Sequence, residues 1–339
     1  MNLLKSFYYR SCSLLPMQLL KSIGSATNLF PYHHTVSKES LPHIKHLYDY
    51  KNDSQFVKDL DFLLKHFNPI TVSEIITSVR QDRKLPSQSF LLSFDDGFKE
   101  VHDVIAPILE KKGVPAIFFI NPAFIDNKDL FYRCKISLLI DELLKNKNNK
   151  NYLHLYNDLL NDENKSLKST IISLKKINQT NAALLDTIAS KIDFSFTLFL
   201  QKQQPFLTTE QLQSLHKRGF SIGAHSMNHP YYQLLSLKAQ IQQTISSCQY
   251  VNEHFDLNNC CFSFPHSDKD LSQALFNGLQ TTDIPLFFGI QNQKNEISNN
   301  MIHRFNAERT EVNFENQVKG LIILTWMRQI TGNNVVTRE

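Results

Sequence analysis

The chain carries the run Ser89-Phe90-Leu91-Leu92-Ser93-Phe94-Asp95-Asp96-Gly97, a short apolar segment that ends at two adjacent carboxylates and a glycine. An apolar segment of this length is typical of a buried parallel strand. The two charges then fall at the carboxyl end of a strand, where α/β folds gather reacting groups. Successive strand side chains point to opposite faces, so both aspartates can enter one pocket only if the chain turns, which Gly97 permits. The alternative interpretation is a turn or helix cap built around Asp-Gly.

A second polar motif, His225-Ser226-Met227-Asn228-His229-Pro230, lies far downstream. It follows residues 220–224, another short run that we interpret as a strand. Spacing of four residues brings two side chains to one side of a helical turn, as paired histidine ligands require. Because the chain has 13 histidines, a purely structural pair is the alternative. Two carboxylates and two imidazoles, each set placed after a strand, are together the groups that hold a divalent metal and activate its water.

Helical and strand-like segments alternate along the chain. Residues 54–67 and 101–109 place their apolar side chains on one helical face. This alternation predicts an α/β fold with a parallel sheet, and a chain of 339 residues with 42% hydrophobic content can bury one large core. The expected strands are the short apolar runs at residues 89–94, 116–120, 220–224, 260–264 and 286–290.

One region does not fit this alternation. Residues 123–204 contain neither glycine nor proline and are rich in Leu, Ile, Lys and Asn. We therefore predict a helical insertion over about residues 127–205 that forms a cap beside the active site. Its Asn- and Lys-rich piece, residues 145–151, is expected to be a solvated loop between helices. The apolar segment 321–327 is expected to form a final helix packed on the core, with a partner interface as the alternative.

Residues 1–26 are expected to form a helical lead-in packed on the main domain, residues 27–339. The first 20 residues are rich in Leu, Phe and Tyr, but Lys5 and Arg10 interrupt them. No uncharged apolar core of signal-peptide or membrane-spanning length therefore forms, and no stretch elsewhere reaches spanning length. An amphipathic segment lying on a membrane surface, as a peripheral contact, is the alternative.

Charge and cysteine content limit which binding partners and which cellular compartment we expect. The net charge is +4, and no basic run with interleaved aromatic residues is visible, so nothing in the sequence favours nucleic acid as a partner. The five cysteines are an odd number and include no C-x-x-C pair, which fits a reducing compartment. We therefore expect a cytoplasmic protein, with a secreted or periplasmic location as the alternative.

The two motifs resemble the first and second motifs of the polysaccharide deacetylases, the NodB-homology group of carbohydrate esterases. Residues 112–122 resemble that family's second strand, Tyr32-His33 the early pair of one branch, and Phe262-Ser263-Phe264-Pro265 the core of its third motif. The resemblance covers most of residues 27–125 and 205–310. It implies that the parallel α/β fold is a distorted, incomplete (β/α) barrel.

The resemblance also implies roles for particular residues. Asp96, His225 and His229 match the metal ligands, and Asp95 matches the general base that deprotonates the attacking water. The expected ion is Zn²⁺, with cobalt, nickel, iron or manganese as alternatives. No late Leu-x-x-His motif follows residue 285, so the acid that protonates the leaving amine is expected to be His33 of the early Tyr-His pair.

Four further residues are expected near the site. His34 and His303 are the alternative acids. The backbone N–H of His266, which follows the motif-three proline, is expected to stabilise the tetrahedral intermediate. An aromatic residue and a glycine usually follow that proline, so Pro265-His266-Ser267 is expected to contact the sugar differently. Arg304 is expected to hold Asp95 ionised, with a surface ion pair as the alternative.

The function that these expectations support is metal-dependent removal of N-acetyl groups from an amino sugar in a polysaccharide, glycolipid or their precursor. An O-acetyl carbohydrate esterase is an alternative with the same chemistry. A non-catalytic, carbohydrate-binding relic of the fold is another, but such a protein has no need for both a metal site and a base. A magnesium phosphohydrolase built on Asp95-Asp96 is disfavoured, because imidazole ligands suit zinc and other transition metals better than magnesium.

Overall fold

The computed structural model describes residues 3–23, 28–161, 166–296 and 298–338, so the expected boundary between residues 26 and 27 lies outside the described residues. Its centre is an eight-stranded parallel sheet in the order β10-β1-β4-β5-β6-β7-β8-β9. The strands are β1 (Pro31–His33), β4 (Leu92–Phe94), β5 (Ala116–Ile120), β6 (Ser221–Ala224), β7 (Phe262–Ser263), β8 (Phe287–Gly289), β9 (Met301–His303) and β10 (Phe305–Asn306). A separate parallel pair consists of β2 (Asn68–Pro69) and β3 (Ser89–Phe90).

Both edges of the large sheet come from one short segment of chain. β9 pairs with β8 through Met301 and Phe287, and β10 pairs with β1 through Phe305 and Pro31. Only Arg304 separates β9 from β10, so the sheet closes on itself and Arg304 lies at the seam. Among the described residues, seven chain segments build the barrel instead of the eight of a full (β/α)₈ barrel. The predicted distorted, incomplete (β/α) barrel is therefore confirmed.

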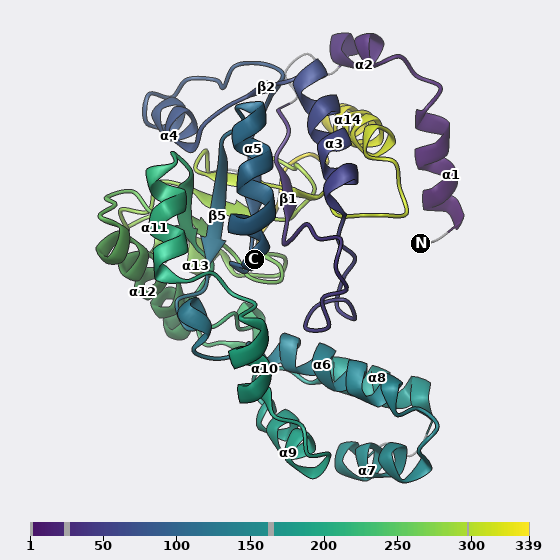
Figure 1. The fold of residues 1–339 in the computed structure, drawn as a ribbon. Helices are drawn as coiled ribbons and strands as arrows, with labels where there is room; N and C mark the ends of the chain where they lie inside the picture. The colour runs from purple at the N-terminus through teal and green to yellow at the C-terminus, as the bar shows by residue number, and fades with distance from the viewer. Residues whose placement is uncertain (1–2, 24–27, 162–165, 297, 339) are drawn as a thin grey trace.

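The strand expected at residues 89–94 is interrupted at Leu91. Ser89–Phe90 pairs with β2, and only Leu92–Phe94 joins the barrel. The other four expected strands are present as β5, β6, β7 and β8. Nearly all residues of the barrel strands are buried, because helices cover the outer face (Figure 1) and strand side chains of both alternations pack into hydrophobic cores. Burial on both faces explains why these strands appear in the sequence as continuous apolar runs.

Helices surround the barrel (Figure 1). The helix expected over residues 54–67 is α3, which buries Phe56 and Leu60 in the main core. Asn52 and Gln55 form a capping box at its start, each side chain accepting a hydrogen bond from the backbone N–H of the other residue. The helices on the barrel are α3 (Asp53–His66), α4 (Val72–Arg80), α5 (Ala106–Lys112), α11 (Thr209–Lys217), α12 (Leu237–Phe255), α13 (Gln273–Leu279) and α14 (Phe314–Ile330).

The helix expected over residues 101–109 begins with a π-helical turn, η1 (Val101–Ile105), and continues as α5. Pro107 lies at the start of α5 and has no backbone N–H, so it cannot donate to the carbonyl four residues earlier. The N–H of Ala106 donates to the carbonyl of Val101, five residues earlier, which is the π-helical pattern. The wider turn therefore occurs where proline interrupts the ordinary pattern.

The region predicted as a helical insertion forms a group of helices that projects from the barrel (Figure 1). These helices have a core of their own, in which Tyr156 is fully buried and its hydroxyl donates to the carbonyl of Leu139 at 3.1 Å. Residues 146–149 link the first two helices, within the loop expected at 145–151. The helices are α6 (Tyr132–Lys145), α7 (Lys150–Leu160), α8 (Leu167–Lys176), α9 (Ala183–Lys191) and α10 (Phe196–Gln203).

Phenylalanine rings join this group of helices to the barrel. Phe206, just after α10, stacks on Phe98 and on Phe124, with ring centres 5.5 and 5.4 Å apart. Phe131, at the start of α6, contacts Phe124 at 5.6 Å. All four rings are buried, and full burial of one such side chain contributes about 1.5–3 kcal/mol. The first and last helices are therefore fixed next to the loop that carries the two aspartates.

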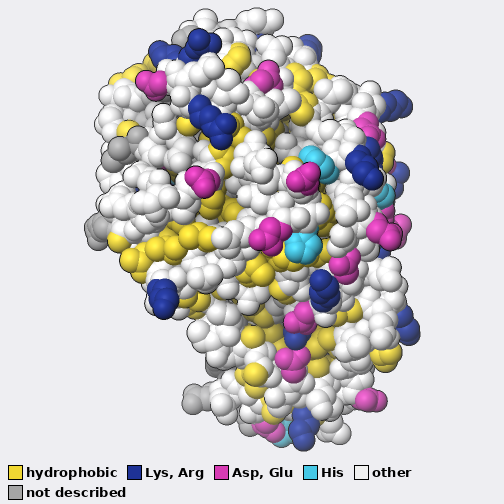
Figure 2. All heavy atoms as spheres, turned by 90° about the vertical axis from the view of Figure 1, so that its left-hand side faces the viewer, with side chains coloured by type: hydrophobic (Ala, Val, Ile, Leu, Met, Phe, Trp, Pro, Cys, Tyr) yellow, Lys and Arg dark blue, Asp and Glu magenta, His cyan; other side chains and the backbone are white. Residues whose placement is uncertain are grey.

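The final helix expected at residues 321–327 is part of α14, which buries Val318 and Ile322 in the main core. The N-terminal helices α1 (Leu3–Cys12) and α2 (Met17–Ile23) pack against α14, and the Tyr8 hydroxyl donates to the carbonyl of Gly320 at 2.6 Å. Within the described part of the chain, we find no helix whose length and hydrophobicity would let it cross a bilayer. Figure 2 shows acidic and basic side chains interspersed over one face of the molecule, so the net charge of +4 is not gathered there.

Gly223→Ala is expected to lower the free energy of unfolding by about 1–3 kcal/mol, because the barrel has no space for a methyl group at this position. A Cβ there would lie 2.6 Å from the ring of Phe119 and 3.0 Å from the carbonyl oxygen of Cys261. Urea unfolding measures the difference. Gly278→Ala is the matched control, since its Cβ would meet only the flexible side chain of Ile241. An unfolding free energy for Gly223→Ala equal to that of the wild type would contradict this packing.

Candidate active site

The chain turns at the two aspartates, as expected. The backbone N–H of Asp95 donates to the carbonyl of His33 at 2.9 Å and continues the pairing of β4 with β1. Asp96 and Gly97 then adopt left-handed conformations, with φ of 71° and 67°. Such a conformation at a non-glycine residue costs roughly 1–3 kcal/mol and persists where the surroundings fix it, as at active sites. Both carboxylates are consequently buried and line one cavity.

His225 and His229 converge through a bent loop, and this corrects the expectation of a helical turn. The N–H of His225 donates to the carbonyl of Ile120 at 2.8 Å, directly after β6. Ser226 and His229 are left-handed, with φ of 65° and 57°, and the Ser226 hydroxyl accepts from the His229 N–H at 3.0 Å. The centres of the two imidazole rings lie 5.0 Å apart. The four-residue spacing therefore indicated that the two histidines act as a pair, but it did not predict the backbone conformation between them.

Three side chains form a cluster with the composition of a metal site. Asp96 Oδ1 lies 3.1 Å from His229 Nε2 and 3.5 Å from His225 Nε2. His225 Nδ1 lies 2.8 Å from the carbonyl oxygen of Ser263, so Nδ1 carries the proton and the Nε2 lone pair faces Asp96. Among the described residues, nothing donates a hydrogen bond to the buried Asp96 Oδ1. An unpartnered carboxylate oxygen facing two imidazole nitrogens fits a divalent cation.

Burial and charge act in opposite directions on Asp96. Burial alone would raise its pKa, but the imidazoles of His229 and His34 outweigh that effect and lower the pKa well below its usual range. Burial lowers the pKa of His225 to about 4. At neutral pH Asp96 is therefore ionised and His225 is neutral, which are the states that metal ligands require.

Asp95 is paired with the arginine at the seam of the barrel. The Arg304 guanidinium donates to both carboxylate oxygens of Asp95, at 2.7 and 2.8 Å, and to the hydroxyls of Ser93 and Ser263, at 3.0 and 2.6 Å. The guanidinium lies over the ring of Tyr32, 4.8 Å from its centre. Burial would raise the pKa of Asp95, but Arg304 lowers it below the usual value. The ion pair is therefore buried and does not lie on the surface.

His34 lines the same cavity and is paired with a carboxylate. Its Nδ1 lies 2.7 Å from Glu308 Oε2, and its ring stacks on Tyr48 with centres 4.2 Å apart. Burial would lower the pKa of His34, but Glu308 outweighs that effect and raises the pKa to about 9. His34 is therefore a protonated imidazole at neutral pH, next to the two aspartates.

His33 does not line the cavity, and this corrects the expectation that it is the general acid. Its ring lies in the hydrophobic core, 5.4 Å from Phe56 and 5.5 Å from Phe94 between ring centres. Strand geometry is the reason, because side chains alternate and the cavity receives Tyr32 and His34. Burial lowers the pKa of His33 well below its usual value, so the imidazole is neutral. A neutral imidazole in the core cannot protonate a substrate.

His303 also lies outside the cavity, and this corrects the expectation that it is an alternative general acid. It belongs to a separate buried network, in which its Nε2 lies 3.1 Å from Glu296 Oε2 and its Nδ1 lies 3.6 Å from Asp268 Oδ2. Arg338 completes this network with ion pairs of 2.9 Å to Asp268 and 2.7 Å to Glu296. The network joins the C-terminal end of the described chain to the loop after β7.

His266 does line the cavity. Its ring stacks on Tyr231 with centres 3.6 Å apart and meets His229 edge-on at 4.3 Å. The hydroxyl of Tyr132 lies 3.2 Å from its Nε2. Its backbone is left-handed, with φ of 57°, and burial lowers the pKa of the imidazole well below its usual value. The residue after the motif-three proline therefore presents a neutral ring beside the metal-ligand cluster.

Sequence reasoning missed several residues that line this cavity or contact the residues lining it. Tyr48 donates its hydroxyl to Asp96 Oδ2 at 3.3 Å, and Glu308 pairs with His34. Both lie in loops without a motif, so no local signal marks them. Ser263, by contrast, stands within the quoted Phe-Ser-Phe-Pro motif, and its place there could have indicated the partner of His225. Arg133 and Tyr231 come from the start of α6 and from the loop after the histidine pair.

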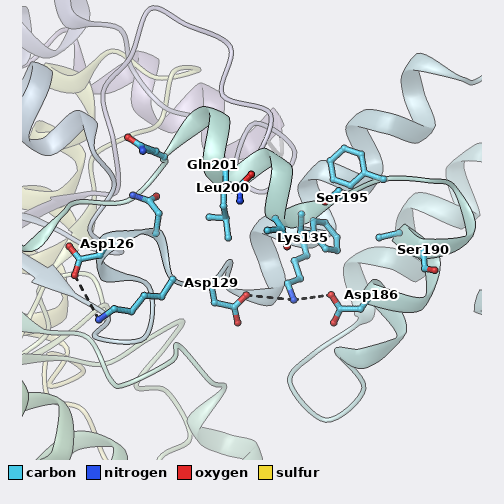
Figure 3. A pocket seen from close by; sticks show the side chains of 15 residues that line it. Asp126, Asp129, Lys135, Asp186, Ser190, Ser195, Leu200 and Gln201 are labelled. Atoms are coloured by element: carbon cyan, nitrogen blue, oxygen red, sulfur yellow. Dashed lines mark hydrogen bonds and ion pairs between the residues drawn. The ribbon is translucent and has the colours of Figure 1, made fainter.

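The cavity measures about 390 Å³, within the usual range for small-molecule sites. A larger cavity of about 580 Å³ lies elsewhere, against α9 and α10 (Figure 3). Lys135 crosses one side of it, 2.9 Å from Asp186 and 3.8 Å from Asp129. That larger cavity contains none of the histidines or paired aspartates described above, so size alone does not identify the reactive site.

Comparison with known proteins agrees with this site and fold. Residues 82–151 and 163–300, more than half of the chain, match the family described as "Polysaccharide deacetylase". Among curated proteins no match is found.

Several solved structures share the fold. The Streptococcus pyogenes deacetylase PplD, in complex with acetate, aligns with a TM-score of 0.55 and 13% identity, covering 86% of this chain and 97% of that one. IcaB from Ammonifex degensii aligns with a TM-score of 0.54 and 14% identity, covering 88% and 97%. A de-N-acetylase from Aggregatibacter actinomycetemcomitans aligns with a TM-score of 0.51 and 14% identity, covering 87% and 99%. At these identities the likeness shows a common fold.

Proposed function

The chain belongs to the polysaccharide deacetylase family, and on this premise we propose that it is a metal-dependent hydrolase acting on an N-acetylated amino sugar. The sugar would be part of a polysaccharide, a glycolipid or their precursor. The observation that carries the proposal is the convergence of His225 and His229 on an unpartnered carboxylate oxygen of Asp96, beside the ionised Asp95. The same observation argues against a non-catalytic relic of the fold, which would need neither the metal-ligand cluster nor a base beside it.

Asp96, His225 and His229 are the residues that would hold the ion, and two imidazoles with one carboxylate favour zinc among divalent metals. When bound, the metal would act as a Lewis acid toward water and the acetyl carbonyl. Asp95 is proposed as the general base that accepts a proton from the attacking water. Arg304 fixes the orientation of that carboxylate through two hydrogen bonds and keeps it ionised.

His34 is proposed as the general acid that protonates the leaving group. An amine is a poor leaving group unless it is protonated. The alkoxide of an acetate ester is a better leaving group and depends less on protonation. A cationic imidazole oriented by Glu308 therefore supports N-acetyl over O-acetyl chemistry. An O-acetyl esterase would not require this pair.

Incubation of the zinc-loaded protein with N-acetylated and O-acetylated oligosaccharides tests the function. Mass spectrometry should show loss of acetyl mass from the N-acetylated compounds, with acetate as the second product. Asp95→Asn is the matched control, and it should leave the substrates unchanged. Loss of acetyl groups from the O-acetylated compounds alone would overturn the assignment of N-acetyl chemistry.

A cytoplasmic location is also proposed, since all five cysteines are buried free thiols, as a reducing compartment allows. A peripheral membrane contact is the alternative, and exposed Phe7, Leu14 and Trp326 on or next to the helices α1 and α14 would suit it. Cell fractionation distinguishes the two: the chain should be recovered in the soluble fraction at low and high salt. If the chain is recovered with the membranes and only detergent releases it, the proposed cytoplasmic location is contradicted.

A further inference from the structure

Arg133 brings a positive charge from the insertion into the active-site cavity. It is the second residue of α6, it is half-buried, and it lines the cavity that contains the two aspartates. Its Nη1 donates to the hydroxyl of Tyr231 at 2.8 Å. The ring of Tyr231 stacks on His266, which in turn meets His229 edge-on. Contacts through two aromatic rings therefore link Arg133 to the metal-ligand cluster, in the same cavity.

The other charged groups of the cavity face partners of opposite charge or potential metal ligands. Asp95 is paired with Arg304, and His34 is paired with Glu308. Arg133 differs, because no carboxylate of the described residues lies within ion-pair distance of it, and Tyr231 supplies only a neutral oxygen. A half-buried guanidinium without a counter-ion keeps donors available for an anion.

We propose that the substrate carries an anionic group, a phosphate or a carboxylate, on or next to the acetylated sugar, and that Arg133 binds it. This inference rests on the proposed deacetylase function. A guanidinium binds the two oxygens of a carboxylate, or two phosphate oxygens, through paired hydrogen bonds. A cavity of about 390 Å³ has room for one sugar ring together with such a substituent. Arg133 would then select the substrate, while Asp95 and His34 act on the acetamido group.

Kinetics on matched pairs of N-acetyl sugars test the proposal. N-acetylglucosamine 1-phosphate is compared with methyl N-acetylglucosaminide for the phosphate, and N-acetylmuramic acid with N-acetylglucosamine for the carboxylate. The wild type should prefer at least one anionic member by about tenfold or more in kcat/KM, mainly through a lower KM, since hydrogen bonds to charged groups are the stronger kind. The preference should fall as salt is added.

Arg133→Gln should remove that preference, and Arg133→Lys should keep part of it, because a point charge remains without the paired geometry. Arg218→Gln is the matched control: Arg218 pairs with Glu110 at the end of α11, so its loss should leave the preference unchanged. Calorimetric titration of the metal-free protein with the preferred anionic sugar gives a readout without turnover, and Arg133→Gln should weaken that binding.

Three outcomes would overturn the inference. Equal kcat/KM for the neutral and anionic members of both pairs would do so while leaving the deacetylase function intact. If Arg133→Gln lowers kcat on both members equally and keeps their ratio, Arg133 only positions Tyr231. Release of acetate neither from these four sugars nor from the N-acetylated oligosaccharides would reject the proposed function and this inference together.

Discussion

Asp96→Asn is expected to lose both the metal and turnover, whereas Asp95→Asn is expected to keep the metal and lose on the order of 10²–10⁴ in kcat. The difference follows from their contacts, since Asp96 Oδ1 faces the two imidazole nitrogens and Asp95 is bound by Arg304. Metal content after gel filtration, measured by mass spectrometry, and acetate release give the two quantities. Equal loss of metal from both variants would refute the separate roles.

Stability must be measured alongside these variants. Arg304 is fully buried, so Asp95→Asn leaves its guanidinium without a counter-ion, and breaking a buried pair in this way costs up to about 3–5 kcal/mol. We therefore expect a lower unfolding midpoint for Asp95→Asn than for Asp96→Asn in the absence of metal. Far-UV circular dichroism at the assay temperature shows whether each variant is folded when its activity is recorded.

His34→Ala is expected to lose on the order of 10²–10⁴ in kcat on an N-acetyl sugar and to keep most activity on an activated acetate ester. The ester's leaving group departs without a proton, whereas the amine does not. His34 donates only while protonated, so the wild-type rate should fall as the pH rises through about 9, the pKa of His34. The variant should lack this alkaline limb in its pH–rate profile.

Two further variants separate His34 from its neighbours. Glu308→Gln removes the carboxylate that raises the pKa of His34, so the alkaline limb should move to lower pH. His33→Leu is the matched control, because His33 lies in the core and a leucine keeps most of its volume. Its pH–rate profile should match the wild type. If His33→Leu lacks the alkaline limb and His34→Ala retains it, His33 is the general acid.

Much of the site could be predicted from short motifs because of how parallel strands are arranged. Asp95, Asp96 and His225 each follow a strand directly, and the carboxyl ends of neighbouring parallel strands meet at one edge of the sheet. Residues far apart in the sequence are thus brought together without any knowledge of the intervening chain. Arg304 was expected near Asp95 from the family resemblance, and its place at the seam that closes the barrel was not predicted.

The choice between His33 and His34 shows what the sequence left open. Adjacent strand residues face opposite sides, so a shift of one residue moves a side chain from the cavity to the core. The phase of β1 is set by its pairing with β4 and β10, and these contacts span long sequence separations. Glu308 and Arg133 were missed for a similar reason, since Glu308 reaches His34 from a loop, and Arg133 reaches the cavity from a helix, without any local pattern.

The most direct test is a crystal structure of the zinc-loaded protein, with the zinc located by anomalous scattering. One zinc ion should lie about 2.0–2.2 Å from Asp96 Oδ1, His225 Nε2 and His229 Nε2, with Asp95 outside its coordination sphere and still paired with Arg304. Zinc bound elsewhere, or these three side chains turned away from a common centre, would contradict the proposed metal site and the hydrolytic function built on it.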